Sequence, residues 1–339
     1  MIGPLAALLL LATTPGKPDF VHSLTPADSL IRPGEAHFAH LWQVPSLGAG
    51  TYPRWAPKSD GLVFEIALDH PTIWIVGAPS RDIVRGGNQC ATSPSFLGPK
   101  EVLYAWTADS STSSVDRWRR QKWTLNPGSK VAIVSGNEHH DLLFPAGSIE
   151  PNASPDGKQI VYTATPAIDP ELYTANVDGS NVRRLTIDQG YDGGGCFSPD
   201  GQLICYQAFH PTLETDKAIY IDLLGKHLVD PSLLDIWVMH ADGAGRGQVT
   251  DLESTSMEPS FTPDSKRIIF SSDYLDVAGR QFDLYITKLD GGTPEKITND
   301  PGPDCFPMFS PNGRYLAFTS GRGAKTAGAQ NVFIAEWKE

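Results

Sequence analysis

The stretch Ser198-Pro199-Asp200-Gly201, followed by the alternating run QLICYQA at 202–208, decides the fold because the chain repeats it. Proline fixes φ at the first corner of a turn, and Asp or Asn with Gly accepts the tight backbone that follows. The apolar residues after the turn recur with the period of a β-strand. Related tetrads, each followed by such a run, occur at Ser154-Pro155-Asp156-Gly157, Thr262-Pro263-Asp264-Ser265 and Ser310-Pro311-Asn312-Gly313.

A second repeated element follows three of these strands. The segments ELYTANVDGSNVRRLT, DIWVMHADGAGRGQVT and DLYITKLDGGTPEKIT end at Thr186, Thr250 and Thr298. Each predicts a strand, an Asp-Gly hairpin turn and a short strand. The unit is therefore four short antiparallel strands in about 45 residues, which is the size of a propeller blade.

Degenerate copies at 52–76 and 95–106 extend the series to six units. The sequence thus predicts an all-β fold, a six-bladed β-propeller of four-stranded antiparallel blades that forms a single domain over 37–339. We expect the strand at 37–44 to complete the last blade and close the ring, which removes two exposed sheet edges. The blades are expected at about 50–86, 88–135, 148–187, 190–251, 254–299 and 302–338.

Two insertions interrupt this pattern, at 107–149 and at 209–234. The second predicts a short surface helix in blade four, because apolar residues recur in it at helical spacing. The apolar residues are Ile219, Leu223, Leu224 and Leu228, and His227 shares their spacing. The glycines at 193–195 precede a strand and not a helix, which disfavours a phosphate-binding loop. We expect them to let the inner strand pass close to its neighbours.

The composition indicates a packed, acidic protein. Hydrophobic residues make up 40% of the chain, and 27 Lys+Arg against 39 Asp+Glu give a net charge of −12. This charge argues against nucleic-acid binding, which rests on neutralising phosphates. The segment at 117–123 (RWRRQKW) is locally basic and aromatic, and could stack on sugars or bases. We favour an outer strand there, with its tryptophans packed.

The apolar run Leu5–Ala12 is too short to span a bilayer and precedes small residues and a Pro-Gly pair. Residues 1–20 are therefore expected to be a signal peptide or a disordered N-terminus, and the protein to be periplasmic or secreted and monomeric, without a transmembrane segment. Cys90, Cys196, Cys205 and Cys305 are too few for a disulfide scaffold. Cys196 and Cys205 flank a hairpin turn, so they form either a cross-strand disulfide or, as we favour, two buried thiols.

These motifs resemble the TolB-type (PD40) propeller repeat over roughly residues 37–338. A finer similarity is to exported, single-domain, TolB-like bacterial propellers. It is carried by Gly190–Gly194 before the tetrad, by the insertion at 209–234, and by Phe306–Gly313 together with Asn331–Trp337. The resemblance implies the fold, but not a function, because propellers host many unrelated activities.

Aligning the inner strands on the tetrad gives two columns of residues. Six residues before its first position lie Gly50, Cys90, Ser148, Asp192, Ser256 and Asp304; four residues before it lie Tyr52, Thr92, Glu150, Gly194, Glu258 and Phe306. The start of each inner strand opens onto the axial channel, so we predict an acidic arc of Glu150, Asp192, Glu258 and Asp304 at one channel mouth. This arc could bind Ca²⁺, a basic peptide or a polyamine. Acids that merely face water at strand starts are the alternative.

His139-His140-Asp141 is a local cluster of metal-ligand types. Neighbours on a strand point in opposite directions, so a metal site would need further ligands such as His210 or His70. We favour a solvated polar loop. No G-x-S-x-G nucleophile elbow occurs.

The leading hypothesis is an exported, non-enzymatic propeller that binds a protein or peptide through its channel mouth and rim loops. The alternative is a metal-assisted polysaccharide lyase or hydrolase, with a cation in the channel and His139 or His140 as the acid or base. Ca²⁺ is the one cofactor that the acids suggest, and no nucleic-acid partner is expected.

Overall fold

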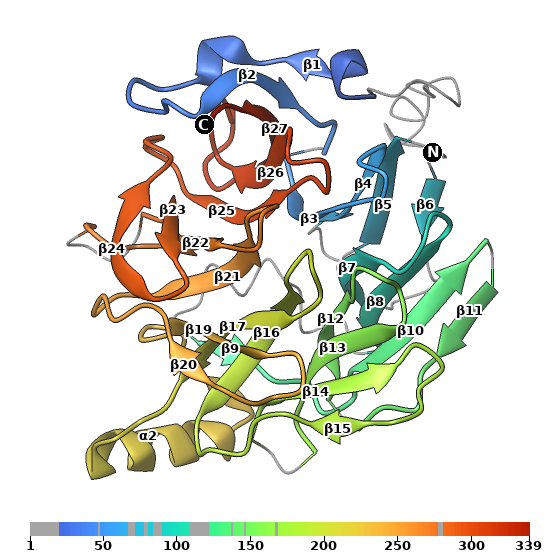
Figure 1. Ribbon diagram of the computed structural model, residues 1–339, viewed down its shortest axis with the longest axis vertical. Coiled ribbons are helices and arrows are strands. Elements are labelled where there is room, and N and C mark those ends of the chain that lie inside the picture. Colours follow the sequence, from blue (N-terminus) through green and yellow to red (C-terminus); the bar gives the residue numbers. More distant parts are fainter. Residues whose placement is uncertain are drawn as a thin grey trace.

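Six β-sheets surround a common axis in the computed structural model (Figure 1). The structure describes residues 20–339 except 47, 67–71, 78–80, 84–89, 109–121, 137, 146, 167–168 and 277–280. The signal-peptide prediction, the basic part of the segment at 117–123 and His70 fall almost entirely outside the described residues. Within them, no helix has both the length and the apolar character needed to cross a bilayer.

Each blade is an antiparallel sheet whose strands succeed one another outward from the axis, as predicted. Blade one contains β3 (Gly50–Trp55), β4 (Gly61–Ile66), β5 (Thr72–Gly77) and β6 (Arg81–Ile83). Blade two contains β7 (Cys90–Phe96), β8 (Glu101–Thr107), β10 (Lys130–Ser135) and β11 (Glu138–Asp141), so its outer strand lies beyond the expected end at 135. Blade three contains β12 (Ile149–Ala153), β13 (Gln159–Ala164), β14 (Glu171–Asn176) and β15 (Arg183–Arg184).

The remaining blades follow the same order. Blade four contains β16 (Tyr191–Phe197), β17 (Leu203–Phe209), β19 (Asp235–His240) and β20 (Gly247–Gln248). Blade five contains β21 (Ser256–Phe261), β22 (Arg267–Ser272), β23 (Asp283–Lys288) and β24 (Gly291–Lys296). The inner strands β3, β7, β12, β16, β21 and β25 contact one another in ring order.

Blade six is built from both ends of the chain. It contains β25 (Asp304–Phe309), β26 (Tyr315–Ser320) and β27 (Asn331–Trp337), followed by β2 (Phe38–Gln43) and β1 (Thr25–Pro26). Strand β2 lies antiparallel to β27, with Phe38 opposite Trp337. The predicted closure of the ring by the N-terminal strand is therefore confirmed, and β1 adds a fifth strand that was not expected.

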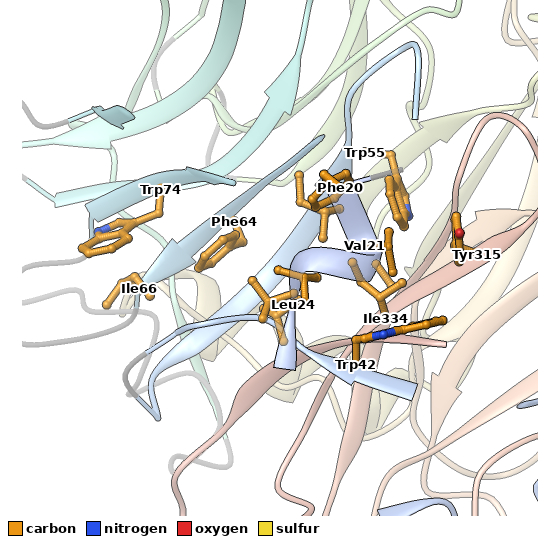
Figure 2. Close-up of a cluster of buried hydrophobic side chains, with 14 residues drawn as sticks. Phe20, Val21, Leu24, Trp42, Trp55, Phe64, Ile66, Trp74, Tyr315 and Ile334 are labelled. Atoms are coloured by element: carbon orange, nitrogen blue, oxygen red, sulfur yellow. The ribbon is translucent and has the colours of Figure 1, made fainter. Parts of the chain in front are cut away.

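The segment before β2 seals the junction between blades six and one. Phe20 and Val21 of the 3-10 helix η2 (Phe20–Ser23), with Leu24, are buried against Trp42 and Trp55 (Figure 2). A second 3-10 helix, η3 (Asp28–Leu30), places the Asp28 carboxylate 2.7 Å from the Leu41 N–H, which donates to it. Apolar burial and this hydrogen bond hold the closing strand in place.

The repeated tetrad works through its side chains. In the turn that begins at Ser154, the serine hydroxyl donates to Asp156 Oδ1 (2.7 Å) and accepts from the Gln159 N–H (2.9 Å). Asp156 Oδ1 also accepts from the Lys158 N–H at 3.1 Å. The same three bonds recur in the turns that begin at Ser198, Thr262 and Ser310. The motif thus satisfies the backbone of a tight turn locally, which explains its repetition.

Every inner strand carries a bulge at the same place. One residue per strand adopts a left-handed backbone, with φ between 50° and 65°, where the pairing register shifts. These six residues are Tyr52, Ser93, Glu150, Gly194, Glu258 and Phe306. Proline follows five of them, where it leaves no unpaired N–H at the bulge. Blade two therefore contributes Ser93 and not the expected Thr92, because its inner strand is displaced by one residue relative to our alignment.

Blade four uses glycines in place of the bulge proline. A Cβ atom on Gly195 would lie 2.8 Å from the Val161 side chain and 3.1 Å from the Leu172 side chain, both in blade three. The triple glycine therefore permits close packing of blade four on blade three, in agreement with its interpretation as a close approach of strands.

The insertion of blade four contains the predicted helix, α2 (Glu214–Leu224). Its buried face is formed by Tyr220, Leu223 and Leu224, whereas Ile219 is exposed. His227 and Leu228 do not continue the helix, because His227 has φ 56° and Leu228 enters the short strand β18 (Leu228–Val229). The predicted helix is therefore confirmed, with Leu223 and Leu224 of the pattern on its buried face, but it ends before His227.

The two insertions meet. Strand β18 pairs with β9 (Trp123–Thr124) from the insertion of blade two. A shared apolar cluster contains Leu125, Tyr220 and Leu224, together with Tyr191 and Met257 at the starts of inner strands β16 and β21. The joined insertions thus cover the ring at the end where these inner strands begin.

Candidate functional site

The four acids of the predicted arc are all buried, and they have different partners. Glu150 Oε2 accepts from the Thr163 hydroxyl and from the Gly194 N–H, both at 3.0 Å, which ties blade three to the bulge of blade four. Glu258 stands at a bulge itself, and its N–H donates to Gln207 Oε1 at 2.8 Å. Within the described ranges, no three His, Cys, Asp or Glu side chains gather as they would around a metal ion. Ligand binding by the arc stays a prediction.

Asp304 belongs to a buried ion triad at the ring closure. Arg322 Nη2 donates to Asp304 Oδ2 and to Glu35 Oε1, both at 2.9 Å, and Arg322 Nη1 donates to Glu35 Oε2 at 3.1 Å. All three side chains are fully buried. Burial raises the pKa of Asp304 to about 7, against the opposing charge of Arg322. Because Glu35 precedes β2, the triad ties the closing segment to blade six.

Asp192 is paired with a histidine. His210 Nε2 lies 3.2 and 3.1 Å from the two carboxylate oxygens of Asp192, and its ring meets the Trp237 ring edge-on. The Asp192 side chain is fully buried, whereas the His210 side chain is 20% exposed. Burial raises the pKa of Asp192. Burial also disfavours protonation of His210, but the hydrogen bond and charge of Asp192 outweigh it and raise the pKa of His210. The histidine of this pair is therefore in contact with solvent, whereas the aspartate is not.

The helix α2 is anchored beside this pair. The Tyr220 hydroxyl donates to Asp169 Oδ1 at 2.5 Å, and the Gly190 N–H reaches Asp169 Oδ2 at 3.4 Å. Burial raises the pKa of Asp169, and the bond from Tyr220 opposes that shift. Asp169 thus joins the loop before β14, the start of β16 and the inserted helix.

A further row of acids was missed by the sequence analysis. The third strands of blades three, four and five begin with Glu171, Asp235 and Asp283. Burial raises the pKa of Glu171 to about 7 and that of Asp235 to about 6, and it also raises the pKa of Asp283. In each of these blades, the threonine that ends the hairpin accepts a hydrogen bond from the backbone N–H of the residue that follows the acid, at 2.8–2.9 Å. These threonines are Thr186, Thr250 and Thr298. An acid at the first position of each third strand and a threonine after the hairpin formed the available signal in the sequence.

These acids differ in their counter-charges. Arg184 donates to Glu171, and Lys296 Nζ lies 2.8 Å from Asp283. Blade four has the neutral amide of Gln248 at the corresponding position, 3.1 Å from Asp235. Asp235 is thus the member of this row that is held by an amide and by the Thr250 hydroxyl, at 2.7 Å, rather than by a cation.

The cluster His139-His140-Asp141 forms the outer strand β11 and not a loop. His139 Nδ1 lies 2.8 Å from the Tyr104 hydroxyl, and Asp141 accepts from the Trp106 indole at 2.9 Å. His140 faces Glu138 at 3.7 Å. The strand therefore directs His139 and Asp141 to one face and His140 to the other, as its period requires.

Cys196 and Cys205 lie directly opposite each other on β16 and β17. All four cysteines are buried free thiols in this structure. The Cys205 thiol points to the Cys196 carbonyl at 3.6 Å. The pair thus has the packing role that we favoured from the sequence.

The blade-four insertion contains several exposed aliphatic side chains. Leu213, Ile219, Ile221 and Leu233 are each more than half exposed. Both lysines of the insertion are engaged by helix acids, Lys217 with Glu214 at 2.8 Å and Lys226 with Asp222 at 2.6 Å. The segment consequently exposes Ile219 and Ile221 on either side of the buried face of α2, and Leu213 and Leu233 beside the helix.

Comparisons with known proteins agree with this architecture. No family model matches the chain. An uncharacterized protein of Agrobacterium fabrum is 23% identical over 294 residues, covering 82% of this chain and 86% of that protein. The Tol-Pal system protein TolB of Francisella tularensis is 28% identical over 198 residues, covering 50% of this chain and 45% of TolB. The chain is a TolB-like β-propeller.

Solved structures support the fold of this TolB-like propeller. TolB from Acinetobacter baumannii superimposes with a TM-score of 0.57 at 16% identity, covering 83% of this chain and 66% of that one. An oligogalacturonate lyase in complex with manganese superimposes with a TM-score of 0.50 at 13% identity, covering 93% and 97%. Likeness at such identities concerns the fold alone. The match to the Francisella protein also spans less than half of that relative.

Proposed function

We propose that this TolB-like propeller is an exported binding module that captures a protein or peptide partner at the blade-four insertion and the adjoining channel mouth. The observation that carries the proposal is the group of exposed aliphatic side chains on and around α2. Large apolar side chains that remain in water on a rigid scaffold are typical of interaction sites. The anchoring of α2 through Tyr220 and Asp169 means that a partner meets a preformed surface, which lowers the entropic cost of binding.

Charge indicates the kind of partner. The insertion keeps Asp216 and Asp230 after its lysines have paired internally, and the whole chain carries a net charge of −12. A partner segment that combines aliphatic residues with Lys or Arg would complement this surface, and its charge would speed association at low salt.

The test is capture of exported proteins on the immobilised chain, with variants that separate the insertion from the rest of the surface. We expect Ile219→Ser/Ile221→Ser to lose the captured partner. Val182→Ser, which removes an exposed aliphatic side chain outside the insertion, should retain it. Equal capture by both variants would refute a docking role for α2. Calorimetry with the identified partner would then measure the affinity and its dependence on salt.

The alternative of a metal-assisted lyase or hydrolase finds no comparable support. His139 and His140 face opposite sides of β11, and each already has a partner within the fold. The similarity to the lyase structure concerns the fold. Turnover of oligogalacturonate that depends on an added divalent cation would be required to revive this alternative.

A further inference from the structure

Six positions of the ring are equivalent by register, because each is the first paired residue after the bulge of an inner strand. Five of them hold uncharged side chains, and blade one holds an arginine. The residues are Arg54, Ser95, Asn152, Cys196, Ser260 and Met308. The repeat thus tolerates a small or neutral residue here, and the arginine requires a reason of its own.

Arg54 is buried, with 8% of the residue exposed, and only part of its guanidinium group forms hydrogen bonds. Nη1 donates to the Pro53 carbonyl at 3.0 Å, and the guanidinium lies 4.2 Å from the centre of the Tyr52 ring. Nε has no hydrogen-bond partner, and no carboxylate in the described part of the chain forms an ion pair with this residue.

The guanidinium extends toward the axis. Tyr52, over which it lies, packs against Phe306 of blade six at a ring separation of 5.0 Å. The pKa of Cys196 is lowered first by its hydrogen bond with Cys205, and the Arg54 charge adds to that effect. Cys196 belongs to blade four, on the opposite side of the ring from blade one (Figure 1), so this influence of the Arg54 charge favours a guanidinium directed from β3 toward the axis.

A buried guanidinium stays protonated, so its charge must be compensated. A buried charge without a counter-charge strongly destabilises a fold. The unused Nε and Nη2 donors lie on one edge of the planar fork, and two parallel N–H···O bonds from that edge match the two oxygens of a carboxylate.

We propose that Arg54 forms a carboxylate-binding site inside the axial channel. The carboxylate belongs either to a small organic acid or to a peptide, and the chemistry of recognition is the same. Glu150 and Glu258 occupy bulge positions of blades three and five, so a ligand with several negative charges is disfavoured. The site does not rest on the binding surface of α2 and would exist without it.

The test is thermal stabilisation and calorimetry of the full chain with acetate, in a buffer without other carboxylates. Acetamide, a neutral analogue of the same shape, is the ligand control. We expect acetate to raise the Tm and acetamide to leave it unchanged, because the added stability follows from binding to the folded state. A short peptide with a free C-terminal carboxylate and the same peptide with a C-terminal amide distinguish the two sources. Tighter binding of the free peptide than of acetate assigns the site to a peptide.

Two variants complete the test. Arg54→Gln should abolish the effect of acetate, and Arg54→Lys, which keeps the charge but lacks the fork, should weaken binding at least about tenfold. Circular dichroism establishes that each variant is folded, and the Lys variant keeps the test informative if the Gln variant is not. Ile219→Ser/Ile221→Ser should bind acetate like the parent. Equal responses to acetate and acetamide, or an unchanged response in folded Arg54→Gln, would overturn the proposal.

Discussion

Blades four and six place an aspartate at the same point of the inner strand, two residues before the bulge, but enclose it in different ways. Asp304 in blade six is bonded to a fully buried arginine, which also binds Glu35 from the closing segment. Asp192 in blade four is bonded to a histidine that remains 20% exposed. One acid is part of a fully buried ion triad, and the other is part of a pair whose histidine is in contact with solvent.

The difference follows from what each blade must do. Blade six joins two distant parts of the chain, so its acid is used to hold the closing segment through Arg322. Blade four is continuous in sequence and carries the inserted helix next to its acid. The same position of the repeat can therefore hold the ring together in one blade and remain sensitive to pH in another.

The largest effect is expected at the ring closure. Arg322→Met should lower the free energy of unfolding by about 3–5 kcal/mol, because Glu35 and Asp304 are then buried without a counter-charge. Urea denaturation measures the loss, and Arg322→Lys, which keeps the charge, should lose less. A Met variant as stable as the parent protein would show that the triad does not secure the closure.

Removal of the side chain that pairs with the aspartate of blade four should destabilise the protein less. We expect His210→Ala to lower the free energy of unfolding by about 1–2 kcal/mol, because solvent at the half-open site can replace part of the lost hydrogen bonding. The raised pKa of Asp192 also lets this carboxyl take up a proton when its partner is removed. Parallel urea titrations of both variants decide the order, and a larger loss for His210→Ala would invert the comparison.

The dependence on pH separates the two acids further. Since the pKa of folded His210 is raised, its stabilising contribution is fully present below the unfolded value of about 6.5 and is lost as the pH rises through the folded value. The stability difference between the parent protein and His210→Gln should therefore shrink by about 1 kcal/mol between pH 6 and pH 8.5. Asp304 titrates in both proteins and cancels in the difference. A difference that is constant with pH would contradict this assignment.

The smallest effect concerns the counter-charge that blade four lacks. Gln248→Lys places a cation where Lys296 pairs with Asp283 in blade five. It should lower the pKa of Asp235 from about 6 and stabilise the protein at pH 7 by about 0.5 kcal/mol. NMR titration of the Asp235 carboxyl measures the shift. An unchanged pKa would mean that the lysine does not adopt the geometry seen in blade five.

Repetition made most of the fold predictable. Turns such as that at Ser154 satisfy their own backbone within a few residues, so they appear in the sequence as a local pattern. The closing strand was found because the last blade had one strand too few. The bulges were visible as Tyr52-Pro53, Glu150-Pro151 and their counterparts, but their meaning needed the register.

The site was less predictable, because its contacts join residues far apart in the chain. Nothing near Asp304 in the sequence indicates Glu35, and nothing near Trp123 indicates that it pairs with Val229. Two acids of the predicted arc take partners from outside the repeat: Asp192 is bonded to His210 of the insertion, and Asp304 to Arg322, which also binds Glu35 of the closing segment. An alignment of the repeats shows which acids lie at a similar height along the axis. It does not show which residues form hydrogen bonds or ion pairs with them.

The pairing of Phe38 with Trp337 also has a kinetic consequence. Strand β2 cannot pair with β27 until β27 has been made, so the closing pair of blade six forms only after residues 331–337 have been synthesised. Contacts of such large sequence separation slow folding. A circular permutant that starts at the turn before β3, with β2 linked directly after β27, would make this blade local and should fold faster at similar stability. The position of the closing pair β2–β27 thus sets the order in which the blades of the ring assemble.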